Sequence, residues 1–213
     1  IGTLVLSCLT GFALGVYRFR ANIFNQRGAV AGAFRAIPYK IKTFEELGLP
    51  RVVSELSKKP RGLILVTGPT GSGKSTTLAS LINLLNETVD HHIITIEDPI
   101  EFVHTNQKCL VNQREVFTHT TGFKRALRAA LREDPDIILV GELRDLETIS
   151  MALSAAERGT IVFATLHTNN AIKTVDRIIS VFPSGEQEGA RNVLAESLQA
   201  VVAQQLLPRV GGG

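Results

Sequence analysis

Nine consecutive residues have the types and the order that bind nucleotide phosphates. They are Gly68, Pro69, Thr70, Gly71, Ser72, Gly73, Lys74, Ser75 and Thr76, and the first eight fit G-x-x-x-x-G-K-[S/T] at every fixed position. The glycines let the backbone turn its N–H groups inward, Lys74 can reach the β- and γ-phosphates, and the Ser75 hydroxyl can bind Mg²⁺. The alternative is a glycine-rich turn with an unrelated lysine, which leaves the flanking elements unexplained. The segment predicts a phosphate loop for a nucleoside triphosphate.

Carboxylates and a histidine follow the predicted strands. Hydrolysis needs an acid near the metal and a group that orients water, and ligands of parallel sheets gather at the carboxyl ends of the strands. The candidates are Glu97, Asp98 and Glu101 after a strand at 92–97, Glu142 after a strand at 137–140, and His167, Thr168 and Asn169 after a strand at 161–166. Spacing alone does not decide which acid of the first group does chemistry. Caps, turn formers or surface acids are the structural alternatives, and His167 alone is as easily structural as functional.

A strand and a helix must hold the phosphate loop. Leu63 to Thr67 is an uninterrupted apolar segment, typical of a buried parallel strand. After the loop, apolar residues recur at helical spacing at positions 78, 81, 82 and 85, so we expect them to face the sheet. We expect Ser80, Asn83 and Asn86 to face away.

The order of the elements predicts an α/β fold. Helices are expected at about 121–132, 145–157, 170–181 and 186–207, and they alternate with the strands. This alternation predicts a mainly parallel sheet with helices on both faces. Two short extended runs between residues 99 and 113 indicate a hairpin.

The N-terminal part predicts a second, separate sheet. Apolar and polar residues alternate from Val16 to Ile23, a turn is expected at Asn25 to Gly28, and a second strand at Ala29 to Ile37, which together make a hairpin. Arg20 and Arg35 stand on its two arms. The polar stretch from Pro38 to Leu49 indicates a domain boundary.

The composition is that of an ordinary globular protein. The chain has 213 residues, a net charge of +3 and 44% hydrophobic residues, a charge too small to indicate a nucleic-acid binder. Two cysteines, Cys8 and Cys109, form neither a disulfide framework nor a metal set, which suits a reducing cytoplasm. The uncharged stretch Ile1 to Val16 is shorter than the roughly 20 residues of a spanning helix, so we expect a buried strand with a turn.

Four motifs resemble one family. The phosphate loop and residues 95–102, 134–142 and 165–168 resemble the Walker A, Asp box, Walker B and His box of the type II/IV secretion ATPases, in the same order. Within that family, residues 18–28, 45–48, 194–198 and 206–209 resemble the retraction ATPases of type IV pili.

This resemblance implies a fold and a function. It implies a RecA-like P-loop ATPase domain at 49–213, a linker at 39–48, and the C-terminal part of a PAS-like α+β domain at 1–38. The implied activity is Mg²⁺-dependent hydrolysis of ATP by a homohexamer that powers type IV pilus retraction. The implied place is the cytoplasm at the inner face of the bacterial inner membrane, beside the pilus platform protein.

The same resemblance implies roles for single residues. Glu101 becomes the general base or water-positioning acid, and Glu142 the carboxylate that holds Mg²⁺ together with Ser75. Arg20 and Arg35 become arginines that reach across to the phosphates, and His167 joins the catalytic set.

Three other functions remain alternatives. A pilus assembly or type II secretion ATPase usually has a four-cysteine zinc module after the position of residues 206–209, where Val210 and Gly211 stand. A DNA-handling motor needs a basic groove with aromatic residues, and the basic cluster Lys124, Arg125, Arg128 and Arg132 has none between its members, so we expect no nucleic-acid partner. A nucleotide-binding switch would bind ATP and release no phosphate.

Overall fold

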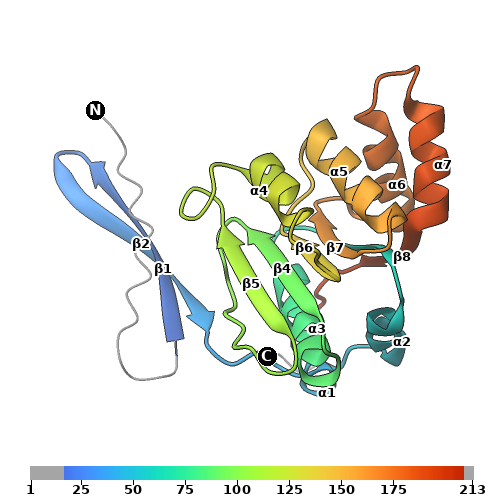
Figure 1. Ribbon diagram of the computed structural model, residues 1–213. Helices are drawn as coiled ribbons and strands as arrows, with labels where there is room; N and C mark the ends of the chain where they lie inside the picture. The colour runs from blue at the N-terminus through green and yellow to red at the C-terminus, as the bar shows by residue number, and fades with distance from the viewer. Residues whose placement is uncertain (1–16, 209–213) are drawn as a thin grey trace. The chain divides into compact units, whose positions relative to one another are not determined.

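The computed structural model describes residues 17–208 (Figure 1). The strand expected within Ile1 to Val16 lies outside these residues. The contacts divide the described residues into two units, one made of residues 17–41 with 101–103 and the other of residues 42–100 with 104–208. Among the described residues, no helix is long and apolar enough to cross a membrane.

The first unit contains an antiparallel hairpin. Strand β1 (Tyr17–Gln26) pairs with β2 (Ala29–Pro38), which confirms the predicted hairpin. The turn itself is shorter than predicted, because only Arg27 (φ 51°) and Gly28 (φ 81°) leave the strands. Left-handed conformations at both positions match the right-handed twist of the strands. Arg20 pairs with Arg35 in the register, so their side chains emerge on the same face.

The second unit is built on six strands. They are β3 (Gly62–Thr67), β4 (His92–Glu97), β5 (Leu110–Glu115), β6 (Ile137–Val140), β7 (Ile161–Leu166) and β8 (Leu198–Ala203). Their order is β5-β4-β6-β7-β3-β8, and every pair is parallel. This confirms the mainly parallel sheet and the strands predicted at the phosphate loop and at 92–97, 137–140 and 161–166.

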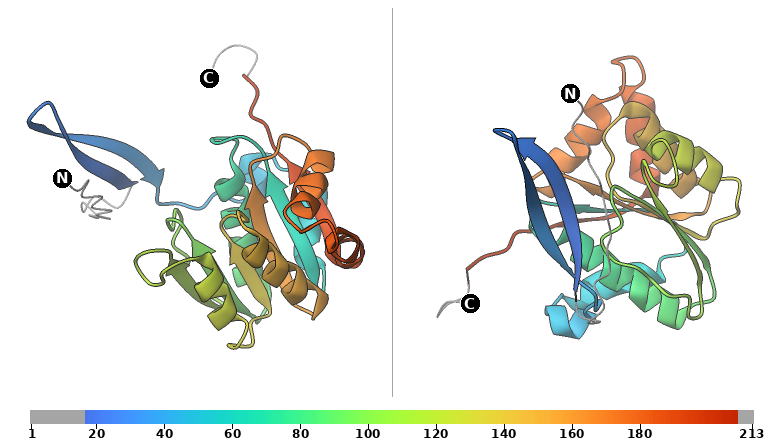
Figure 2. Two further views of the ribbon diagram at one scale, coloured as in Figure 1. Left: turned by 90° about the horizontal axis from the view of Figure 1, so that it is seen from above. Right: turned by 90° about the vertical axis from the view of Figure 1, so that its left-hand side faces the viewer.

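Helices cover both faces of this sheet (Figures 1 and 2). One face packs against α4 (Phe123–Ala130), α5 (Leu146–Glu157), α6 (Ala171–Ser180) and α7 (Gln187–Ser197). The other packs against α1 (Phe44–Leu47), α2 (Arg51–Glu55), the 3₁₀ helix η1 (Leu56–Lys58) and α3 (Lys74–Thr88). The central strands β3, β6 and β7 are buried throughout, as their continuous apolar sequences predict.

The single helix predicted at 186–207 is wrong. The helix α7 ends at Ser197, and Leu198 begins strand β8, which pairs with β3. The sequence Leu198 to Ala203 has apolar residues that suit either period. The pairing with the open edge of β3 decides, because it satisfies backbone groups that a longer helix would leave unpaired at that edge.

The hairpin predicted between residues 99 and 113 is also wrong. Residues 98–109 form no strand, and β5 pairs with β4 in parallel rather than turning back on a neighbour. Polar side chains hold the intervening backbone instead. Asn86 donates to the Thr105 carbonyl at 2.7 Å and accepts from the Gln107 amide at 3.0 Å.

This bonding explains a third error, the outward orientation predicted for Ser80 and Asn86. The predicted apolar stripe of α3 is buried, but Ser80 (2% exposed) and Asn86 (0%) are buried as well. Ser80 donates to the Lys42 carbonyl, and Asn86 holds the segment before β5. Other segments of the chain therefore cover the polar side of α3. Ser80 and Asn86 form hydrogen bonds with the backbone groups of those segments.

Candidate nucleotide-binding site

The phosphate loop joins β3 to α3 in the conformation that its glycines permit. β3 ends at Thr67, and α3 begins at Lys74 with Gly73 as its N-cap. Gly68, Gly71 and Gly73 have φ values of 147°, 81° and 90°, where other residues would be strained. The N-terminus of α3 contributes free N–H groups and a partial positive charge, which favour a bound phosphate.

Gly68 is also required because the backbone of Gln204 approaches it closely, a contact that the sequence did not reveal. A Cβ atom at this position would lie 2.2 Å from the carbonyl oxygen of Gln204. Gln204 follows β8. Its backbone amide donates to the Thr67 carbonyl at 2.8 Å, and its side-chain Nε2 donates to Thr77 Oγ1 at 2.8 Å. Gln204 thus bonds the residue before the loop, Thr67, and the residue after it, Thr77. Sequence reasoning missed it because it placed this residue in a helix.

Lys74 and Ser72 are the buried polar groups of the loop. Lys74 is 8% exposed, and its ammonium donates to the carbonyls of Gly68 at 2.8 Å and Pro69 at 3.0 Å. Ser72 is 3% exposed, and its hydroxyl has no hydrogen-bond partner among the described residues. A buried hydroxyl without a partner costs free energy, and an oxyanion in the loop would supply the missing acceptor.

His167 connects the loop to the predicted metal-binding acid. Its Nδ1 lies 3.4 Å from Lys74 Nζ, and its Nε2 lies 3.4 Å from Glu142 Oε1. An ammonium can only donate, so Nδ1 is the acceptor and Nε2 carries the proton that points to Glu142. The Arg144 side chain donates to the other Glu142 oxygen from Nε and Nη2, both at 2.7 Å. The structure therefore brings Lys74, His167 and Glu142 into one chain of contacts.

Hydrogen bonds between strand ends fix the elements that carry these groups. The Thr165 hydroxyl on β7 donates to the Gly141 carbonyl at 2.5 Å, and the Leu143 amide donates back to Thr165 at 3.0 Å. The Thr67 hydroxyl at the end of β3 donates to the Thr168 carbonyl at 2.5 Å. The ends of β3, β6 and β7 are thus tied together around the loop.

Gly141 stands where a Walker B motif usually has its first acid, and the structure gives a reason. A Cβ atom at Gly141 would lie 3.1 Å from the Ile96 carbonyl oxygen and 3.3 Å from Glu97 Cα. The end of β6 therefore packs closely against the end of β4. Glu142 remains the carboxylate of this motif, and its side chain is 19% exposed.

The acids after β4 fall into both units. Glu97 Oε1 accepts from Thr95 at 2.6 Å and from Gln113 at 3.2 Å. Glu101 belongs to the first unit, where its Oε1 lies 3.9 Å from Arg20 Nη2. Arg35 is exposed on the same hairpin. The structure thus brings Arg20 and Glu101 together within the first unit, and Lys74, His167 and Glu142 together within the second.

His104 has a lowered pKa. Burial lowers its pKa to about 4, and its backbone amide donates to Gln113 Oε1 at 2.8 Å. It is therefore neutral at pH 7. His104 follows the acid segment, so no positive charge from this side chain balances the carboxylates there.

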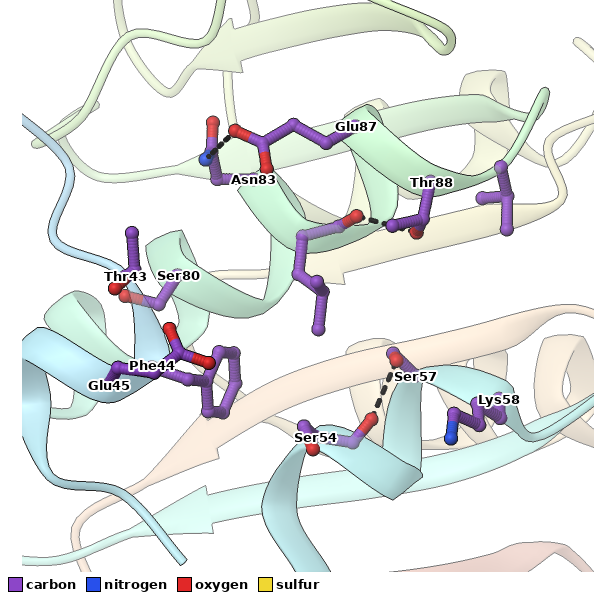
Figure 3. A pocket seen from close by; sticks show the side chains of 12 residues that line it. Thr43, Phe44, Glu45, Ser54, Ser57, Lys58, Ser80, Asn83, Glu87 and Thr88 are labelled. Carbon is purple, nitrogen blue, oxygen red and sulfur yellow. Dashed lines mark hydrogen bonds between the residues drawn. The ribbon is translucent and has the colours of Figure 1, made fainter. Parts of the chain in front are cut away.

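A pocket of about 450 Å³ lies away from the loop, between α1, α2, η1 and the C-terminal half of α3 (Figure 3). Phe44 lines it, together with several hydroxyl side chains (Figure 3). Those hydroxyls already donate to backbone carbonyls: Ser54 to Arg51, Ser57 to Ser54, and Thr88 to Leu84. None of the phosphate-loop residues 68–76 lines this pocket, so it is separate from the candidate nucleotide site.

Known proteins are similar to this chain in sequence and in fold. The type II/IV secretion system protein family matches residues 39–211. The type IV pilus retraction ATPase PilT of Pseudomonas aeruginosa is 62% identical over 93% of the chain and 58% of its own length. A twitching motility protein of Neisseria gonorrhoeae is 59% identical over 90% of the chain and 51% of its own length.

A solved structure gives the same result. The crystal structure of the pilus retraction motor PilT with bound ADP has a TM-score of 0.90 and 60% identity, and the match covers 94% of this chain and 58% of that one. The chain thus spans a little over half the length of these relatives. With the family model matched over most of its length, and with the phosphate loop, His167 and Glu142 in contact at the carboxyl ends of the strands, this chain belongs to the type II/IV secretion system protein family.

Proposed function

We propose that this chain is part of an ATP-hydrolysing motor that retracts type IV pili. The observation that carries the proposal is the contact chain from Lys74 through His167 to Glu142. It joins the phosphate loop after β3 to a carboxylate after β6, across the end of the intervening strand β7. The names of the relatives from Pseudomonas aeruginosa and Neisseria gonorrhoeae support retraction rather than another use of the same chemistry.

Each group has a task in this proposal. The N–H groups of the phosphate loop and Lys74 bind the β- and γ-phosphates of ATP, and the Ser72 hydroxyl donates to a phosphate oxygen. Ser75 and Glu142 would hold Mg²⁺, since a hydroxyl and a carboxylate are the oxygen ligands this ion prefers. When bound, Mg²⁺ neutralises charge that develops on the phosphates. His167 senses the γ-phosphate beside Lys74, and Glu101 orients the attacking water.

The wider assembly belongs to the proposal too. Residues 1–38 are the end of a PAS-like domain, 39–48 a linker, and 49–213 the RecA-like domain. Six copies form a ring at the cytoplasmic face of the inner membrane and act on the pilus platform protein, with no nucleic acid involved.

The proposal is tested with the full-length protein that contains this chain. We expect Mg²⁺-dependent phosphate release from ATP, and restored retraction of labelled pili in bacteria that lack their own retraction ATPase. Phosphate release without restored retraction would assign the chain to another secretion motor. Binding of ATP without phosphate release would make it a switch.

Arg20 and Arg35 test the role of the hairpin. We expect Arg20→Lys and Arg35→Lys to lower kcat at least about tenfold, well below the arginine-finger range of about 10³ to 10⁵, while melting temperature and ring assembly are unchanged. A lysine cannot reproduce planar, bidentate contact with phosphate oxygens. Steady-state phosphate release measures the effect.

The structural alternative for Arg20 is the ion pair with Glu101, whose side chains are 35% and 34% exposed. Such a pair contributes only about 0 to 1 kcal/mol, and a lysine could keep it. Arg27→Lys, at the exposed turn of the same hairpin, is the matched control and should leave kcat unchanged. Full activity of both test variants would make the hairpin a scaffold.

A further inference from the structure

Two polar side chains on one face of β5 lie beside the acid segment. Gln113 and Glu115 are two residues apart in a strand, so they point to the same face of the sheet. In the register with β4, Gln113 pairs with Thr95 and Glu115 with Glu97. β5 therefore presents two hydrogen-bonding groups at the point where the chain leaves β4 toward Glu101.

Glu115 holds the first end of that segment. It is 5% exposed, and its Oε2 accepts from the Ile100 amide at 3.1 Å while its Oε1 accepts from the Thr118 hydroxyl at 2.7 Å. A buried carboxylate needs such donors, and its charge makes the bond to the amide stronger than a neutral one. The amide of Ile100, which directly precedes Glu101, is thus fixed to the sheet.

Gln113 holds the second end. Its Oε1 accepts from the His104 amide at 2.8 Å, and its Nε2 donates to Glu97 Oε1 at 3.2 Å. One side chain therefore links the last residue of β4 to the backbone three residues beyond Glu101. The amide orientation is set by these two partners, since the oxygen must face a donor and the nitrogen an acceptor.

The segment between these two points has no regular structure of its own. Residues 98–104 form no helix or strand, so no ladder of backbone bonds fixes them. Ile100, just before Glu101, is 8% exposed, whereas the Glu101 side chain is 34% exposed. A short irregular segment is thus fixed at both ends, and its acid remains accessible between them.

We infer that Gln113 and Glu115 are positioning residues for Glu101, which fix both ends of its segment so that its carboxylate meets the attacking water. The inference rests on the proposed function, in which Glu101 orients that water. Displacement of a reacting group by about 1 Å can cost about 10²-fold in rate, so loss of either bond should slow the chemical step.

The experiment uses the full-length protein and separates kcat from KM. We expect Glu115→Ala and Gln113→Leu each to lower kcat by about 10- to 100-fold, with the KM for ATP unchanged within about threefold. Glu115→Gln should restore kcat to within about threefold of wild type, because its amide oxygen can still accept from Ile100. Arg114→Ala is the matched control, since Arg114 lies between them on β5 and bonds Glu133 at 2.6 Å instead.

A second set of variants asks whether these residues act through Glu101. In a Glu101→Gln background, adding Glu115→Ala should cause no further loss in single-turnover hydrolysis of labelled ATP. A further loss equal to that seen in the wild-type background would overturn the inference, because the two residues would then act independently. Should Glu115→Ala fail to fold, Gln113→Leu in the same background decides.

The outcomes distinguish this inference from the proposed function. Full activity of Glu101→Gln would overturn the inference, because Glu101 would not orient the water, but ATP hydrolysis by the chain would stand. Absence of phosphate release from the unsubstituted protein would overturn the proposed function instead. An inactive Glu101→Gln beside fully active Glu115→Ala and Gln113→Leu would overturn only the positioning role.

Discussion

Replacement of Lys74 by alanine should abolish ATP hydrolysis and leave the fold intact. Lys74 is 8% exposed within the phosphate loop, where its ammonium contacts the carbonyls of Gly68 and Pro69 and the His167 ring. When ATP is bound, the same charge would neutralise the β- and γ-phosphates, and one such electrostatic contact is worth about 10² to 10³ in kcat. We expect phosphate release to fall by at least about 10²-fold.

Stability should change little in this variant. Lys74 leaves no apolar contact of the core unfilled, and its removal takes a partly desolvated charge out of the loop. Thermal unfolding should therefore shift by no more than a few degrees. Lys173→Ala, on the exposed surface of α6, serves as the control and should hydrolyse ATP normally. If Lys74→Ala released phosphate at the wild-type rate, nucleotide hydrolysis at this loop would be excluded.

Local sequence was enough to predict the phosphate loop and the central strands. The strands that carry the site are buried on both faces, so each is a continuous apolar run that ends where polar residues begin. The acid and the histidine at those ends, Glu142 and His167, follow directly from the strand assignments. Their contact follows from the sheet order, in which β6 and β7 are neighbours.

The parts that sequence did not predict depend on which segments become neighbours. Leu198 to Ala203 could be helix or strand until β3 offers an open edge. Gln204 contacts the phosphate loop only because strand β8 places its carbonyl against Gly68. Asn86 looks like a surface residue of α3, yet residues 105–108 lie across it and use its side chain as a partner. Such roles leave no local pattern in the sequence.

The roles of Gln113 and Glu115 on β5 also depend on which segments become neighbours. In the sequence, Gln113 and Glu115 alternate with Asn112 and Arg114, which reads as a polar stretch of chain. Only parallel pairing with β4 turns one side of that alternation toward the acid segment. The predicted hairpin would have removed this arrangement, so the wrong topology also concealed the two side chains.

Replacement of Glu142 by glutamine should separate chemistry from binding. Its carboxylate lies between the Arg144 guanidinium, at 2.7 Å, and His167 Nε2, at 3.4 Å. Glutamine keeps the shape and one acceptor but loses the charge that would hold Mg²⁺. We expect kcat to fall by about 10² to 10³-fold, since this interaction acts on charge that develops in the transition state. Nucleotide affinity, measured by fluorescent ADP, should stay within about tenfold.

The control for this variant is another acid close by in the sequence. Glu147 begins α5 and pairs with Lys124 at the surface, so Glu147→Gln removes one negative charge without touching the contact chain. Its kcat should match that of the wild type. Equal losses in both variants would mean that net charge matters rather than the place of Glu142. A fully active Glu142→Gln would move the metal-binding role to another acid, and Glu97 and Asp98 at the end of β4 would be the first to test.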